Sequence, residues 1–385
     1  MLNKGKPLRM KIGILGTRGI PNAYGGFEQF AQYLALGLQK KGHEVYVYNS
    51  SEHPYRDKVW NGVHIVHCKD WEKTIGTAGQ FVYDYHCFRD AAGRNYDVLL
   101  QLGYTSSSVW HRLWPKKAVN IINMDGLEWK RSKYNRMTRK FLRLAERLAV
   151  KHGSILIADS IGIRDYLREE FGKESIYIPY GAYIPTTYDP AVPGRYGLDP
   201  NGYYLLMARM EPENNVEMII RGWMDSGKGR PLVLIGNPGN AFGKYLVRTY
   251  RHERLRFIGA VYEEEVVNAL RHYSSLYLHG HSVGGTNPSL LEAMACGCSI
   301  AAHDNAFNKA ILEEDAGFFS TPREVTAILD DLPSQVLADE RRKKNLQKIR
   351  TLFSWDKIID DYEKVFLTCG RSLSNNPKLA SKLPG

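Results

Sequence analysis

The sequence has few cysteines and no long apolar run. Its 385 residues include five cysteines, an odd number, and so few do not predict the disulfide framework of a secreted domain. Cys296 and Cys298 flank one glycine, which forms neither a CxxC redox pair nor a zinc half-site. No apolar run approaches the roughly 18 residues of a membrane-spanning helix. We therefore expect a cytoplasmic protein.

The sequence also lacks the signatures of a metal or a dinucleotide cofactor. No DxD-type pattern and no cluster of His and Cys indicates a metal, so we expect metal-independent chemistry without a bound cofactor. The first glycine loop has Gly13, Gly16 and Gly19 in place of GxGxxG, and the second predicted strand ends in VYVYNSS, with no acid for a ribose hydroxyl. A nicotinamide-dependent enzyme is disfavoured.

What the sequence does contain is a regular alternation of strand-like and helix-like segments. At 385 residues the chain exceeds one ordinary hydrophobic core. Strands alternating with helices specify parallel sheets. We expect an α/β protein with two doubly wound, Rossmann-like domains facing across a cleft. The expected parts are a first domain at 10–185, a linker rich in Pro and Gly at 186–202, a second domain at 203–353, and a helix at 354–370 that packs back on the first domain.

Two glycine-rich loops follow predicted strands, GTRGIPNAYGGFE in the first half and HSVGGTNPSLLEAMACG, residues 281–297, in the second. In the second loop, Asn287 suits a helix N-cap, Pro288 the first helical position and Gly297 the left-handed position after the helix. A helix N-terminus offers N–H groups and positive potential to an anion such as phosphate. The alternative is an ordinary turn. Because ligands bind at the carboxyl ends of parallel strands, two such loops suggest one ligand held between the domains.

Four motifs carry a resemblance to a known family. GGFEQF, MARMEPENN, FIGAVYEEEV and GGTNPSLLEAMACGCSI occur in this order. The chain resembles retaining, nucleotide-sugar-dependent glycosyltransferases of family 4, which have the GT-B fold. It is most similar to the subgroup of rhamnosyltransferases of bacterial surface polysaccharide synthesis, over about residues 10–370.

The resemblance assigns roles to particular residues. It places Glu292 on the donor ribose and Arg209 on the leaving diphosphate, a task that suits the fixed charge and forked donors of arginine. A lone arginine after a strand is otherwise a surface residue. The positions implied to surround the donor phosphates and sugar are Gly25, Gly26, Asn214, Gly284, Gly285, Thr286 and Asn287.

The sequence departs from the family at two of these positions. Gly284 stands where the family usually has a Glu that contacts sugar hydroxyls, and Asn214 stands where it usually has a Lys. His281 could replace the missing acid as a hydroxyl partner, and the Gly-Gly-Thr loop could bind more of the phosphate. The alternative is that catalysis has been lost.

Asp125 is a further candidate, because it follows the predicted strand AVNIINM. A carboxylate at this end of a strand can orient or deprotonate an acceptor hydroxyl. The alternative is that it caps the segment GLEWKR. Glu128 and Glu28 are weaker candidates, for which the same two roles, catalytic or structural, are open.

Positive charge is concentrated in the first half. Residues 1–185 hold 28 Lys and Arg against 17 Asp and Glu, and the rest of the chain has 24 of each. The excess gathers in the predicted helix 133–151. Arg136, Lys140, Arg143, Arg147 and Lys151 recur along one face, and Tyr134, Met137, Phe141, Leu144 and Leu148 form an apolar stripe that we expect to be buried. A solvated face is the usual explanation, but attraction to an anionic membrane surface or to a lipid-diphosphate acceptor also fits. No module for nucleic acid is recognised.

The functional hypothesis is retaining transfer of L-rhamnose from dTDP-L-rhamnose to a saccharide acceptor, lipid-linked, at the inner face of the cell membrane. A nucleotide-sugar epimerase or hydrolase of the same fold is the first alternative. The second alternative is a non-catalytic protein that binds polyanions.

Overall fold

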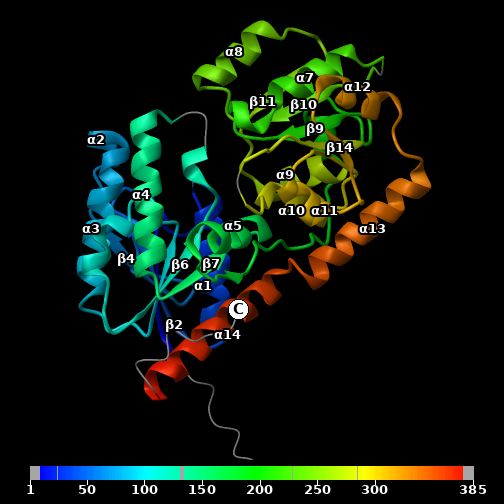
Figure 1. Ribbon diagram of the computed structural model, residues 1–385. Helices are drawn as coiled ribbons and strands as arrows, with labels where there is room; N and C mark the ends of the chain where they lie inside the picture. Colours follow the sequence, from blue (N-terminus) through cyan, green and yellow to red (C-terminus); the bar gives the residue numbers. More distant parts are fainter. Residues whose placement is uncertain (1–8, 24, 131–133, 228, 284, 376–385) are drawn as a thin grey trace, which may run out of the picture. The chain divides into compact units, whose positions relative to one another are not determined.

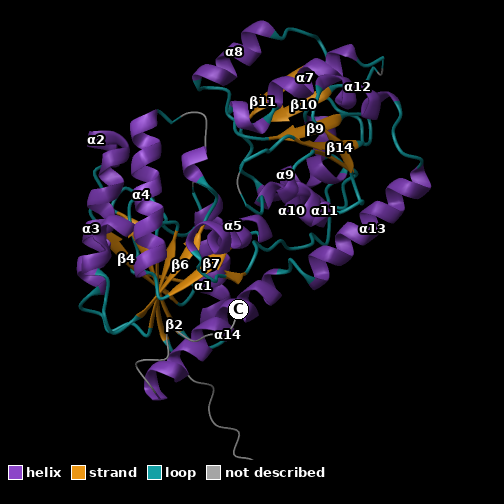
Figure 2. Cartoon of the chain, in the orientation of Figure 1, coloured by secondary structure: helices purple, strands orange, loops and turns teal. Residues whose placement is uncertain are grey.

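The structure is a computed structural model that describes residues 9–23, 25–130, 134–227, 229–283 and 285–375. The chain forms two compact units. Unit 1 comprises residues 1–129, 134–179 and 355–385, and unit 2 comprises 130–133 and 180–354. In each unit, helices cover a mostly parallel sheet (Figures 1 and 2). The predicted fold class, two doubly wound α/β domains, is confirmed.

The sheet of unit 1 has eight strands in the order β3-β4-β2-β1-β5-β6-β7-β8. Its bounds are β1 Lys11–Leu15, β2 Glu44–Ser50, β3 Val59–Trp60, β4 Val63–Cys68, β5 Val98–Leu102, β6 Val119–Met124, β7 Ile155–Ala158 and β8 Ile176–Tyr177. All pairs are parallel except β3 with β4. The central strands are apolar runs because both faces of a parallel sheet are buried.

The helices of unit 1 are α1 Gly26–Lys40, α2 Glu72–Ile75, α3 Gly79–Ala91, α4 Arg136–His152, α5 Ile161–Phe171 and α14 Trp355–Asn375, with 3₁₀ turns at Gly76–Ala78, Ser108–Leu113 and Glu128–Lys130. The last helix of the chain, α14, packs on α1. The ring of Phe30 lies 5.7 Å from that of Trp355 and 5.4 Å from that of Tyr362. Gly37 of α1 permits the close approach, because a Cβ there would lie 2.3 Å from Ile359.

Helix α4 buries a different face from the one its apolar stripe predicts. Met137 is 82% exposed and Leu144 is 52% exposed, and Phe141 and Leu148 are only partly buried. The residues that do face the core are Leu142, Ala145, Glu146, Ala149 and Val150. The prediction that the stripe is buried was therefore wrong for Met137 and Leu144, whereas Tyr134, Phe141 and Leu148 are partly buried. Small alanines let the helix approach the core closely, and Leu142 and Val150 flank them.

The sheet of unit 2 has six parallel strands in the order β11-β10-β9-β12-β13-β14. Its bounds are β9 Tyr204–Met207, β10 Leu232–Ile235, β11 Leu255–Gly259, β12 Leu276–His279, β13 Ile300–His303 and β14 Gly317–Phe319. The helices are α6 Val192–Arg195, α7 Val216–Asp225, α8 Ala241–Thr249, α9 Glu264–His272, α10 Pro288–Ala295, α11 Ala306–Leu312, α12 Pro322–Asp330 and α13 Gln335–Thr351, with a 3₁₀ turn at Pro212–Asn214.

Residues 186–202, for which the composition predicts a linker, lie within unit 2. Val192 and Leu198 are buried. The guanidinium of Arg256 donates to the carbonyl oxygens of Tyr196 and Gly197 at 3.0 and 2.9 Å. The segment is thus part of a packed domain despite its prolines and glycines. Within the ranges that the structure describes, no helix is long and apolar enough to cross a membrane.

Candidate functional site

The candidate site of unit 2 begins with the turn from β12 into α10. The Asn287 side chain accepts a hydrogen bond from the Ser289 N–H at 3.0 Å, and Pro288 is the first helical residue. Gly297 follows the helix with φ of +69°. These contacts confirm the helix start and stop that the sequence indicates. Of the loop before α10, Gly285 is half-buried and Thr286 is buried, whereas Gly284 lies outside the described residues. The helix N-terminus thus lies at the carboxyl end of the sheet.

Glu292 of α10 is held by an arginine that was not singled out from the sequence. Its Oε2 accepts from the Arg271 guanidinium at 2.5 Å. The Arg271 side chain is 3% exposed and that of Glu292 is 27% exposed. Burial opposes the charge of Arg271, but the adjacent carboxylate outweighs it and raises the pKa of Arg271. The sequence offers one indication that Arg271 is buried: it lies in the same helix as the apolar Val267 and Leu270, which are buried.

Arg209 and Asn214 lie in the loop that follows β9. Arg209 is exposed, while Asn214 is buried and its Nδ2 donates to the Arg209 carbonyl oxygen at 2.8 Å. Asn214 therefore shapes the loop that carries Arg209, and its amide nitrogen is already used. A Cβ at Gly280 would lie 2.1 Å from the Asn214 carbonyl oxygen. The backbone of the β9 loop thus touches the backbone at the end of β12.

The same two loops are joined by further hydrogen bonds. Ser282 donates to the Glu213 carbonyl oxygen through its N–H at 3.1 Å and through its Oγ at 2.7 Å. Asn215 Nδ2 donates to the Gly280 carbonyl oxygen at 2.8 Å. Because β9 and β12 are neighbours in the sheet, Arg209 and the loop before α10 stand at one edge of unit 2.

His281 is fixed through its backbone and its ring. Its carbonyl oxygen accepts from Asn305 Nδ2 at 3.0 Å and from Asn308 Nδ2 at 3.1 Å. Its ring stacks on that of His279, with 4.5 Å between centroids. His279 is buried, and neither of its ring nitrogens has a hydrogen-bond partner among the described residues. Burial, followed by the neighbouring His281 and His303, lowers the pKa of His279 well below its ordinary value, so this ring is neutral.

In unit 1, the loop after β1 requires glycine at some positions and not at others. Gly16 has φ of +96° and a Cβ there would lie 2.3 Å from the Leu102 carbonyl oxygen. Gly19 has φ of +125°, with the Asn49 side chain at 2.3 Å. Gly25 instead has extended backbone before α1, and the nearest atom to a Cβ there is a Glu28 oxygen at 3.4 Å. The fold of unit 1 therefore requires glycine at 16 and 19 but not at 25. Gly26 is the exposed first residue of α1.

Glu28 is a structural residue of this loop. It is 4% exposed, and its Oε1 accepts from the Arg18 N–H at 2.9 Å. The Arg18 guanidinium in turn pairs with Glu72 at 2.7 and 2.9 Å. The Glu28 carboxylate therefore ties the glycine loop to the first turn of α1.

Asp125 directly follows β6 and is half-buried. Its carboxylate has no hydrogen bond or ion pair within the described part of unit 1, so it does not cap the turn at Glu128–Lys130. Only β5 separates β6 from β1. Because these strands are parallel, Asp125 lies at the same sheet edge as the loop of Gly25. Among the residues that are described, no group of three or more His, Cys, Asp or Glu could hold a metal ion.

Comparisons with known proteins agree with this geometry. Residues 196–351 match the family model of glycosyl transferases group 1, and residues 104–183 match a domain of unknown function, DUF1972. A search of curated proteins gives no match. Solved structures share the fold. Sucrose-phosphate synthase (tll1590) from Thermosynechococcus elongatus has a TM-score of 0.78 at 16% identity, covering 94% of this chain and 100% of that one.

Two more structures are similar over both units. Anabaena Alr3699/HepE, in complex with UDP and glucose, has a TM-score of 0.73 at 15% identity, and covers 94% of this chain and 100% of its own. The α,α-trehalose-phosphate synthase (UDP-forming) from Burkholderia vietnamiensis has a TM-score of 0.69 at 13% identity, with the same coverage of 94% and 100%. The two Rossmann-like units are thus those of the GT-B fold. The chain therefore has the GT-B fold, and its residues 196–351 match glycosyl transferases group 1.

Proposed function

We propose that the chain transfers a sugar from a nucleoside-diphosphate donor to a saccharide acceptor. The observation that carries the proposal is the edge of unit 2 where the N-terminus of α10, the Glu292 carboxylate and the exposed Arg209 follow neighbouring parallel strands. A helix N-terminus and an arginine suit a diphosphate. The carboxylate suits ribose hydroxyls, which are hydrogen-bond donors.

Each residue has a distinct task in this proposal. The N–H groups of Gly285, Thr286 and Asn287 bind the diphosphate, together with Gly284. Arg209 balances the charge that the diphosphate gains as its bond to the anomeric carbon breaks. The electron pair of that bond leaves with the diphosphate, and the acceptor oxygen forms the new bond. His281 contacts a sugar hydroxyl in place of the acid that the sequence lacks.

Asp125, Gly25 and Gly26 complete the proposal from unit 1. The unengaged Asp125 carboxylate orients the acceptor hydroxyl and accepts its proton. Unit 1 itself does not require a glycine at position 25, which supports close approach of a ligand to this backbone. The chemistry proposed here needs no metal, because Arg209 and backbone N–H groups supply the positive potential.

The finer identity of the substrates rests on the sequence resemblance. It favours dTDP-L-rhamnose as donor, retention at the anomeric carbon, and a lipid-linked saccharide of cell-surface polysaccharide as acceptor. The UDP and glucose named for HepE and the UDP-forming reaction named for the trehalose-phosphate synthase support a nucleotide-sugar donor of the same general class. Screening dTDP- and UDP-sugars by calorimetry distinguishes these donors.

Two variants test the site, and each has a control. Glu292→Gln keeps a hydrogen-bonding group beside Arg271, and we expect it to weaken nucleoside-diphosphate binding by about 1–3 kcal/mol. Glu253→Gln, an acid of unit 2 whose side chain is 85% exposed, is the matched control. Arg209→Ala should lower kcat more than it weakens donor binding, because the diphosphate charge grows in the transition state. Arg248→Ala is its control.

Product analysis decides between the reaction classes. Transfer requires acceptor for donor consumption, hydrolysis releases free sugar without acceptor, and epimerisation returns an altered nucleotide sugar. Unchanged nucleotide affinity in folded Glu292→Gln would show that nucleotide binding does not need the charge of Glu292. An Arg209→Ala variant with altered KM alone would make Arg209 a binding residue only.

A further inference from the structure

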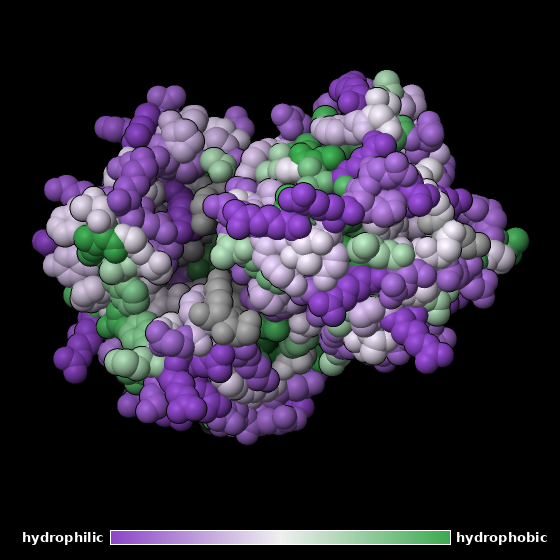
Figure 3. All heavy atoms as spheres, turned by 90° about the horizontal axis from the view of Figure 1, so that it is seen from above, coloured by the Kyte–Doolittle hydropathy of each residue, from purple (hydrophilic) through white to green (hydrophobic). Residues whose placement is uncertain are grey.

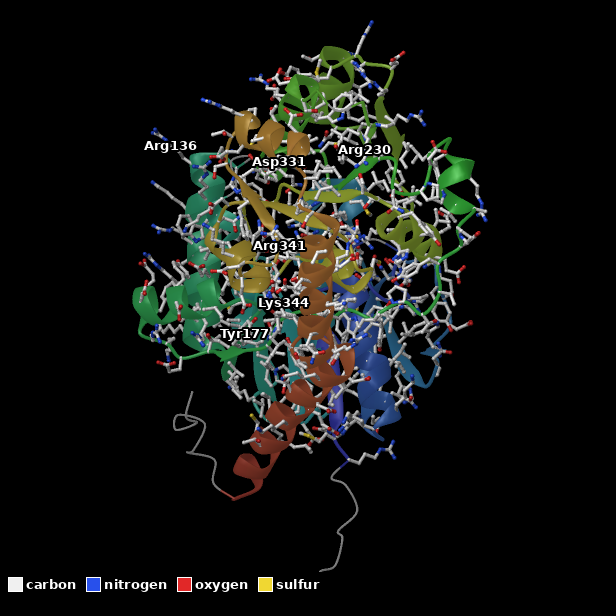
Figure 4. All side chains as sticks on the ribbon, turned by 90° about the vertical axis from the view of Figure 1, so that its right-hand side faces the viewer. Arg136, Tyr177, Arg230, Asp331, Arg341 and Lys344 are labelled. Carbon is white, nitrogen blue, oxygen red and sulfur yellow. The ribbon has the colours of Figure 1, made fainter. Side chains whose placement is uncertain are left out.

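One face of α4 is uniformly basic. Its exposed cations are Arg136, Arg139, Lys140, Arg143, Arg147 and Lys151, and we call this set the basic face. The single acid of the helix, Glu146, is 2% exposed and accepts from the Tyr166 hydroxyl at 2.9 Å. Burial raises the pKa of Glu146. The basic face therefore contains no acidic side chain of its own helix, and Arg136 extends outward from the first turn (Figure 4).

Exposed apolar side chains border the basic face. Met137 and Leu144 are 82% and 52% exposed, and they are seven residues apart, two turns along one side of the helix. The side of α4 next to Met137 and Leu144 faces α3. There, the ring centroids of Phe141 of α4 and Phe81 of α3 are 5.6 Å apart. Hydrophobic side chains lie among hydrophilic ones on the upper surface of unit 1, at the left of Figure 3. Solvation alone favours polar residues at such positions, so two large apolar side chains among cations need another explanation.

Most of these cations are not used within unit 1. Arg136, Lys140, Arg147 and Lys151 form no ion pair with another described residue. Arg143 differs, because its guanidinium lies 4.1 Å from the centre of the Trp129 ring. Cations without partners attract an anionic surface, and apolar side chains beside them gain free energy only if that surface has an apolar interior. An anionic bilayer has both properties, whereas a nucleic-acid backbone has only the first.

We propose that α4 docks on an anionic lipid bilayer. The helix lies in the plane of the interface, the basic face contacts lipid phosphates, and Met137 and Leu144 enter the boundary between headgroups and acyl chains. This inference does not rest on the proposed transfer reaction, because it concerns a surface of unit 1 that needs no donor. It adds a membrane partner to the chain.

Vesicle sedimentation tests the charge contribution. The full chain is mixed with phosphatidylcholine vesicles that contain phosphatidylglycerol, and with pure phosphatidylcholine vesicles. We expect binding only to the anionic vesicles, with release as salt rises. Reversing Arg136, Lys140, Arg147 and Lys151 to Glu should weaken the partition at least about 100-fold. Arg143 is left in place to preserve its contact with Trp129.

A matched control has the same change in net charge. Lys244, Arg248, Lys343 and Arg350 are exposed residues of α8 and α13 in unit 2, and reversing them also takes the net charge from +11 to +3. This variant should retain most of its vesicle binding. If both variants lose binding equally, the attraction is a property of net charge and the docking surface is refuted.

The apolar pair separates a bilayer from other polyanions. Met137→Ser with Leu144→Ser should weaken vesicle binding about tenfold and leave heparin or RNA binding unchanged. Vesicle binding that is indifferent to this pair, or binding to RNA but not to vesicles, would overturn the proposal. The phosphatidylglycerol vesicles contain no diphosphate, so binding to them cannot arise from the diphosphate of an acceptor. Far-UV circular dichroism and denaturant titration of each variant show that the chain remains folded.

Discussion

The two glycine loops lead into helices that each carry a carboxylate near the start, and these carboxylates have different partners. In unit 1, Glu28 accepts from the Arg18 N–H and is almost fully buried. In unit 2, Glu292 pairs with the buried Arg271 but remains partly exposed. The first carboxylate is enclosed by its own loop, whereas the second has surface left for a ligand. A carboxylate after a glycine loop is therefore a binding group only where its fold leaves it accessible.

Removing Glu292 should give the largest effect on stability. Glu292→Ala leaves the Arg271 guanidinium buried without its anion, and we expect a loss of about 3–5 kcal/mol in the free energy of unfolding. Denaturant titration of the full chain measures it. Adding Arg271→Met to this variant should restore much of the stability without restoring nucleotide binding. A double variant as unstable as Glu292→Ala would contradict this explanation.

The two units should respond to pH in opposite directions. Burial, partly offset by the hydrogen bond from Ser106, raises the pKa of Asp84 in unit 1 to about 7. Because the folded pKa is raised, the stabilisation is complete below about pH 4 and is lost as pH rises through about 7, by at most roughly 4 kcal/mol. The pKa of His279 in unit 2 is lowered, so its contribution is complete above about pH 6.5 and is lost as pH falls below that value.

Variants assign these pH effects to their residues. Asp84→Asn should flatten the loss of stability between pH 4 and 7, and His279→Phe should flatten the loss on the acid side. Free energies of unfolding from denaturant titrations between pH 4 and 8 give both slopes. If neither variant changes the slope, other titrating groups control the pH dependence.

Glu28→Ala should have a smaller effect than Glu292→Ala. It removes one charge-assisted hydrogen bond to the Arg18 N–H, and we expect a loss of about 1.5–3 kcal/mol. Hydrogen exchange should increase in the loop between β1 and α1 and not in unit 2. Glu44→Ala is the control, because Glu44 is a partly exposed acid of β2 in the same unit and a smaller loss is expected. A Glu28→Ala variant with an unprotected loop but normal stability would show that the hydrogen bond orders the loop without stabilising unit 1.

Asn287→Ala should have a smaller effect than Glu28→Ala. It removes the hydrogen bond to the Ser289 N–H at the start of α10, and an N-cap is worth about 1 kcal/mol. Helix α1, for which Gly25 is the N-cap, has no side-chain cap, so Gly25→Ala should cost still less in stability. If Gly25→Ala nevertheless lowers turnover strongly, the glycine serves the ligand.

The sequence predicted the strands and the glycine loops well, because buried parallel strands are continuous apolar runs and helix caps are local. It did not predict which face of α4 is buried. The apolar stripe that includes Met137 and Leu144 indicated one face, but the face that packs on the core carries Ala145 and Ala149. It also missed the pairing of Arg271 with Glu292, which lie 21 residues apart in different helices. Such a pair forms only when α9 and α10 pack against each other. The hydrophobic periodicity of a sequence does not determine which helices pack together.

The position of α14 has a consequence for how the protein is made. Because α14 covers α1 through Trp355 and Tyr362, unit 1 is built from both ends of the sequence. A ribosome that has released only the first 179 residues has supplied the whole sheet of unit 1 but not the helix that covers Phe30. Unit 1 therefore completes its core only after all of unit 2 has been synthesised, and a chain shortened before residue 355 leaves that apolar surface open to aggregation.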